Sequence, residues 1–113
     1  MSAFRGHEAG MDRSAFERLR IAAESATGGS SRDTIQRLSS AAVDFTSLLS
    51  ASDFPDGHLR ERFELICASF GQADASGAFP AIVTMFEVER ELLCKDIAAL
   101  FVACTLLPGV AHV

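Results

Sequence analysis

The chain has 113 residues, of which 49% are hydrophobic and 22% charged, and fifteen acidic against ten basic residues give a formal charge of −5. This length and composition predict one globular domain with its own core, and they exclude a disordered chain. The basic residues are scattered along the sequence. A nucleic-acid partner is therefore disfavoured, because phosphate binding depends on clustered cations. The negative charge also disfavours binding to an anionic membrane surface.

The three cysteines indicate a reducing compartment. Cys67, Cys94 and Cys104 lie in apolar stretches, and no CxxC motif is present. Cys94 and Cys104 are expected roughly 15 Å apart along one helix, too far for a disulfide. We therefore expect reduced thiols in the core. Because the first ten residues also contain no apolar run, we expect a cytoplasmic protein.

The first predicted helix covers residues 12–27. Its apolar residues recur at helical spacing and are mostly alanines, so we expect this helix to pack closely against its neighbours. They are Met11, Ala15, Leu19, Ala22 and Ala26. Asp12 or Ser14 is expected to cap the start of the helix, and Gly28 with Gly29 is expected to end it.

The second predicted helix covers residues 32–51 and has the clearest amphipathic pattern. Its apolar arc consists of Ile35, Leu38, Ala41, Ala42, Phe45, Leu48 and Leu49. The outer face is uncharged at Val43 and Thr46, where lysine or glutamate is more usual. These two residues are therefore candidates for a second contact surface.

Two further helices are expected over residues 55–73 and 80–107. Asp53 is a candidate cap for the third helix, and Pro55 and Asp56 suit its first turn. The core face of the third helix is Leu59, Phe63, Ile66, Phe70 and Ala73. The fourth begins at Pro80, and its core stripe is Ile82, Phe86, Leu93, Ile97, Leu100, Cys104 and Leu107.

Four helices joined by short turns predict an all-α fold, a single-domain up-and-down four-helix bundle. The bundle is expected to cover residues 11–107. An N-terminal tail (1–10) and a C-terminal tail (108–113) flank it.

The end of the fourth helix is unusual because Ile97 to Leu107 contains no charged residue. Residues on the side away from the predicted core are apolar or uncharged: Ala98, Phe101, Val102 and Thr105. A helix that is apolar all round is normally buried all round. Eleven residues span only about 16 Å, too short for a bilayer, so we expect no membrane partner.

Three explanations remain for this apolar flank. It dimerises or binds a protein partner, it is covered by a tail through Phe4 or Val110 to Val113, or it is a scatter of exposed apolar residues. The first is favoured, with a homodimer as the main expectation, since burial of Phe101 and Val102 gives about 1.5 to 3 kcal/mol per side chain.

Glu89 and Asp96 are the candidate ionisable site. The helical phase places Glu89 on the stripe of Ile82, Phe86 and Leu93, with Asp96 seven residues later on nearly the same face. Paired carboxylates can hold a metal or transfer protons when partners converge from other helices. The favoured interpretation is that Glu89 lies at the edge of the packed face and pairs with an arginine such as Arg60, Arg62 or Arg37.

The sequence contains no positive sign of catalysis. Its three histidines are spread over the chain, and Ser14, Ser69 and Cys67 have no nearby base in the sequence. We therefore expect no cofactor. The favoured hypothesis is a non-enzymatic protein-interaction module of the adaptor, regulator, inhibitor or chaperone type. The alternative hypothesis is a bundle with an internal metal or small-ligand site around Glu89 and Asp96.

Overall fold

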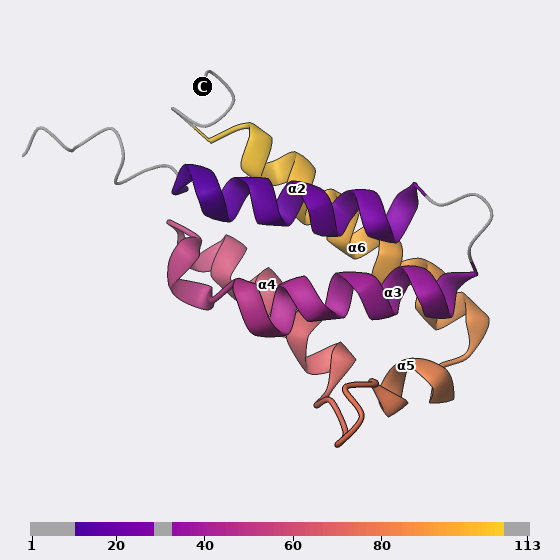
Figure 1. The fold of residues 1–113 in the computed structure, drawn as a ribbon. Helices are drawn as coiled ribbons and strands as arrows, with labels where there is room; N and C mark the ends of the chain where they lie inside the picture. The colour runs from indigo at the N-terminus through magenta and orange to yellow at the C-terminus, as the bar shows by residue number, and fades with distance from the viewer. Residues whose placement is uncertain (1–10, 29–32, 108–113) are drawn as a thin grey trace, which may run out of the picture.

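The computed structural model describes residues 11–28 and 33–107 (Figure 1). These residues form four main helices: α2 (Arg13–Thr27), α3 (Thr34–Val43), α4 (Gly57–Phe70) and α6 (Glu87–Thr105). Three short elements join them, the π-helical turn η1 (Asp44–Leu48), the 3-10 turn η2 (Ala51–Asp53) and the helix α5 (Pro80–Thr84). No strand occurs within these ranges, so the prediction of an all-α fold with four main helices is confirmed.

Helix α6 is the central element of the packing. It contacts α2, α3 and α4, whereas α2 packs mainly on α3 and α6. Figure 1 shows α2 and α3 side by side and running in opposite directions. The buried face of α2 is almost entirely alanine, as predicted, which lets the neighbouring helices approach closely.

Aspartates start three of the main helices. The side chains of Asp12, Asp33 and Asp56 accept hydrogen bonds from the amides of Ser14 (3.1 Å), Gln36 (2.9 Å) and Leu59 (2.8 Å), respectively. Each bond satisfies an amide that has no partner within its own helix. The cap at Asp12 matches the sequence pattern.

The predicted start and end of the third helix were wrong. Asp56, which was expected inside the first turn, is its cap, while Asp53 accepts a hydrogen bond from the amide of Ser50 at the start of η2. The helix ends at Phe70 because Gly71 takes φ +68°, a conformation that favours glycine. Ala73 therefore lies outside the helix and is exposed.

The predicted end of the second helix was also wrong. Regular α-helix stops at Val43, and the amide of Leu49 bonds to the carbonyl of Asp44, five residues earlier, instead of four. The additional residue in this turn changes the helical phase. As a result Leu49 is buried and Leu48, which was expected in the core, is 46% exposed.

Five phenylalanines form an aromatic cluster in the core around α4. The rings of Phe54 and Phe63 lie 4.8 Å apart, and those of Phe45 and Phe63 lie 5.5 Å apart. Phe70 contacts both Phe45 and Phe79, at 5.9 Å and 6.2 Å. These separations suit aromatic pairs, so the cluster ties η1, η2 and the start of α5 to α4.

The fourth predicted helix is broken in two. Met85 and Phe86 have extended backbone, with ψ of 150° and 156°, and separate α5 from α6. Phe86, which was expected in the core stripe, is 75% exposed. The other residues of the predicted core stripe face the core as expected: Ile82, Leu93, Ile97, Leu100 and Cys104 are buried, and Leu107 is partly buried.

Arg90 stabilises the break between α5 and α6. Its guanidinium donates hydrogen bonds to the carbonyls of Ile82 (3.1 Å) and Met85 (2.6 Å), which closes the end of α5. Its Nε donates to the hydroxyl of buried Thr34 on α3 (2.9 Å), and that hydroxyl donates to Glu87 (2.9 Å). Arg90 thereby joins α3, α5 and α6.

The predicted tails, residues 1–10 and 108–113, lie outside the described residues. The same holds for the proposed cover of the last helix by Phe4 or by Val110 to Val113.

Replacement of Arg90 tests its joining role. Arg90→Met keeps an unbranched side chain but removes every donor, so the buried Thr34 hydroxyl and the carbonyls of Ile82 and Met85 each lose one hydrogen bond. We expect the free energy of unfolding to fall by about 2 to 3 kcal/mol, measured by urea unfolding followed by circular dichroism. Arg13→Met, at an exposed position of α2, is the matched control. Equal stability of the two variants would contradict this role.

Candidate functional site

The outer face of α6 carries a row of exposed apolar residues, which we call the α6 stripe. The residues follow one another at spacings of four, three, four, three and four: Val88, Leu92, Lys95, Ala99, Val102 and Leu106. Residues at this spacing lie along one face of a helix. Val88, Leu92, Val102 and Leu106 are 64%, 55%, 57% and 81% exposed, and Lys95 is the single charged member.

The opposite face of the same helix is buried. Leu93, Ile97, Leu100 and Cys104 each keep 5% or less of their surface exposed. Helix α6 is therefore apolar on two sides, one facing the core and the other facing solvent. This arrangement accounts for the uncharged residues that end the helix.

The predicted interface on the last helix is only partly exposed. Phe101 is half-buried because its ring stacks on Phe16 of α2, with centroids 5.3 Å apart. Ala98 and Thr105 are half-buried as well, whereas Val102 is exposed and belongs to the α6 stripe. Helix α2 thus supplies part of the cover of Phe101, and the role of this residue in an interface stays a prediction.

The two predicted interface residues on the second helix, Val43 and Thr46, are both exposed. Val43 ends α3, and Thr46 lies in η1, where its hydroxyl donates to the carbonyl of Ala42 (2.8 Å). They lie on different elements from the α6 stripe. Their role as a second contact surface stays a prediction.

Glu89 and Asp96 lie on the surface rather than on the core face. Because the helix restarts at Phe86, Glu89 is the third residue of α6, and its carboxylate accepts a hydrogen bond from the amide of Phe86 (2.8 Å). This is the usual position for a glutamate that caps a helix. Arg37, one of the arginines expected beside Glu89, instead lies 3.7 Å from Glu91.

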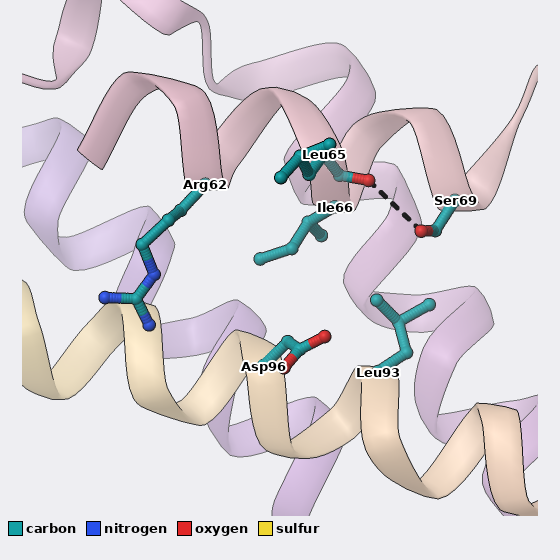
Figure 2. A pocket seen from close by; sticks show the side chains of 6 residues that line it. All are labelled: Arg62, Leu65, Ile66, Ser69, Leu93 and Asp96. Carbon is teal, nitrogen blue, oxygen red and sulfur yellow. Dashed lines mark hydrogen bonds between the residues drawn. The ribbon is translucent and has the colours of Figure 1, made fainter. Parts of the chain in front are cut away.

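Two shallow hollows lie between α4 and α6. The first, of about 190 Å³, is shown in Figure 2 and is lined by Arg62, Leu65, Ile66, Ser69, Leu93 and Asp96. The second, of about 270 Å³, is lined by Ser69, Met85, Glu89, Leu92, Leu93 and Asp96. Both are smaller than typical ligand pockets of about 300 to 1,000 Å³.

Glu89 and Asp96 both line the second hollow. Within residues 11–28 and 33–107, however, no three histidine, cysteine or acidic side chains converge as a metal site requires. The alternative hypothesis placed these two carboxylates inside the bundle. That placement was wrong, because both side chains face solvent.

The surroundings of the three cysteine thiols disfavour the thiolate form. Burial raises the pKa of the Cys67 thiol to about 11, with a further contribution from Glu64, and raises the pKa of the Cys104 thiol to about 12. Burial also raises the pKa of the Cys94 thiol. A thiol attacks as its thiolate, so these shifts disfavour nucleophilic chemistry. All three cysteines are free, in agreement with the expectation of reduced thiols.

The sequence analysis missed most of the α6 stripe. Val88, Leu92, Ala99 and Leu106 were not proposed as surface residues, although their alternating spacing of four and three is visible in the sequence. Arg90 was missed too. No local pattern predicts its contact with Thr34, because the two residues are 56 positions apart.

Comparisons with protein-family models, with curated proteins and with solved structures found no match for this chain. Its function is therefore argued from its own residues. Across the described part of the chain, no helix has the length and apolarity needed to cross a membrane.

Replacement of Glu89 tests whether its carboxylate caps the start of α6. Glu89→Ala removes the acceptor of the Phe86 amide, and we expect the Tm to fall by a few degrees. Glu89→Gln keeps a carbonyl acceptor and should retain most of the stability. Thermal unfolding followed by circular dichroism makes the comparison. Wild-type stability of Glu89→Ala would contradict the capping role.

The reactivity of Cys67 tests the burial of the thiols. A rise in pKa from 9.0 to about 11 lowers the thiolate fraction at pH 8 by about 100-fold. Reaction with Ellman's reagent should slow by at least this factor relative to protein in urea. Because the pKa of Cys67 is higher in the folded state, the contribution of its thiol to the free energy of unfolding is fully present below pH 9. This contribution is lost as the pH rises toward 11. Equal rates with and without urea would contradict the burial.

Proposed function

We propose that this protein is a non-enzymatic interaction module that binds a protein partner through the α6 stripe. The observation that carries the proposal is the row of four large apolar side chains, each more than half exposed, on the outer side of the central helix. Several large apolar residues along one exposed face of a small protein are typical of a binding surface, whereas single exposed apolar residues are common everywhere.

The energetics favour a reversible contact. Complete burial of a valine or leucine is worth about 1.5 to 3 kcal/mol, so covering Val88, Leu92, Val102 and Leu106 from their present exposure gives about 4 to 8 kcal/mol. Association itself costs about 4 to 15 kcal/mol. A stable complex must therefore add apolar surface from the partner and from neighbouring residues of this chain.

Two exposed apolar residues outside the α6 stripe are suited to add this surface. Leu65 of α4 is 64% exposed and lines the hollow next to Leu93, and Phe86 is 75% exposed just before α6 begins. Phenylalanine is a strong anchor in protein interfaces when a pocket receives it. The binding surface is thus the α6 stripe with α4 at its edge.

The scaffold that we propose is an up-and-down bundle in the cytoplasm. Antiparallel α2 and α3 (Figure 1), and α4 and α6 running in opposite directions (Figure 2), support the topology. Free cysteines support a reducing compartment. The scattered basic residues favour a protein rather than a nucleic acid as the partner. An adaptor, regulator, inhibitor or chaperone acts in this way.

Site-specific photo-crosslinking in the producing cells tests the proposal. A photo-crosslinking amino acid in place of Val102 should form a covalent adduct of higher mass, since this side chain is expected at the centre of the contact. The same amino acid in place of Ile21, an exposed residue of α2, is the matched control. Adducts that are equally weak at both positions would contradict a binding role for the α6 stripe.

A further inference from the structure

The α6 stripe has the same spacing in both directions. From Val88 to Leu106 the intervals are four, three, four, three and four, and the reverse order is identical. Reversal exchanges Val88 with Leu106, Leu92 with Val102, and Lys95 with Ala99. A second copy of this helix in the opposite direction can therefore match every position of the first.

The side chains also match in size under this reversal. Large apolar residues fall opposite large apolar residues at both ends of the stripe. At the centre the long side chain of Lys95 falls opposite the small Ala99 of the second copy. The alkyl part of a lysine can cover an apolar neighbour while its ammonium group reaches solvent.

The charges of α6 are separated along its length. Its first half carries Glu87, Glu89, Glu91 and Asp96 against Arg90 and Lys95, and no charged residue follows Asp96 up to Leu107. A parallel copy places the acidic halves side by side and Lys95 beside Lys95. An antiparallel copy instead places each acidic half against an uncharged half, and it also aligns the two helix dipoles favourably.

We propose that the partner of the α6 stripe is a second copy of this chain, packed antiparallel to the first about a two-fold axis near Ile97. This inference rests on the proposed function and names its partner. In this dimer Leu92 of each copy contacts Val102 of the other, and Val88 contacts Leu106. The contact is isologous, so one surface supplies both sides of the interface.

Light scattering with refractive-index detection measures the mass, because the chain has no Trp or Tyr for absorbance. The mass should rise with concentration from 12.1 kDa toward twice that value. Val102→Glu and Leu92→Glu should each raise the dimer Kd by about tenfold or more, while Ile21→Glu should leave it unchanged. All three positions are exposed, so circular dichroism should show an unchanged fold.

Engineered cysteines test the orientation. After mild oxidation, an equimolar mixture of Leu92→Cys and Val102→Cys should give a disulfide between the two variants, identified by mass spectrometry. Each variant alone should give little product. The wild-type chain, with Cys94 and Cys104 buried and Cys67 half-buried, shows the background. Efficient disulfide formation by Val102→Cys alone indicates a parallel dimer and overturns the proposal.

The remaining outcomes separate this inference from the proposed function. A monomer at every concentration, with a photo-adduct at position 102 to a different protein, overturns the dimer and leaves the proposed function standing. A monomer in which the thiol of Val102→Cys does not react with Ellman's reagent places a tail of the same chain over the stripe. That result overturns both.

Discussion

The structure depends on the burial of one face of α6 against three helices. Leu93, Ile97, Leu100 and Cys104 face the core, and α2, α3 and α4 all contact this helix. With α2, α3 and α4 as its packing partners, α6 leaves its outer side uncovered. The alanine-rich face of α2 permits a close approach, which brings Phe16 onto Phe101 and leaves the α6 stripe as the exposed apolar face of this helix. The position of the α6 stripe thus follows from the packing of the core.

Much of the fold could be predicted from local patterns, and the failures have physical causes. The cap at Asp12 and the core faces of α2 and α4 follow from side-chain type and helical spacing. The break before α6 does not, because the residues around Met85 include no glycine or proline that would indicate it. It is stabilised by Arg90, whose partner Thr34 lies on another helix. The π-helical turn after Val43 likewise depends on tertiary packing that local propensity does not describe.

The exposed apolar residues lie on the helix that the sequence indicated but on a different face of it. The sequence pattern predicted a last helix that is apolar all round at its end, with a surface at Ala98, Phe101, Val102 and Thr105. No local pattern predicts that Phe16 covers part of Phe101, since that contact joins residues 85 positions apart. Of the predicted residues on this helix, Val102 alone is shared with the α6 stripe. For Glu89 the error came from assuming a continuous helix, because a restart at Phe86 makes the same residue a cap.

The two faces of α6 have separable roles. The buried face contributes to the free energy of folding, whereas the exposed face contributes almost nothing to it, because its side chains remain in water in the folded chain. Substitutions on the α6 stripe are therefore expected to leave the fold unchanged, whereas substitutions on the buried face are expected to destabilise it. Because the charges of α6 end at Asp96, the proposed contact between two copies gains most when the uncharged half of one meets the charged half of the other. The antiparallel orientation that we propose thus follows from where the helix carries its charge.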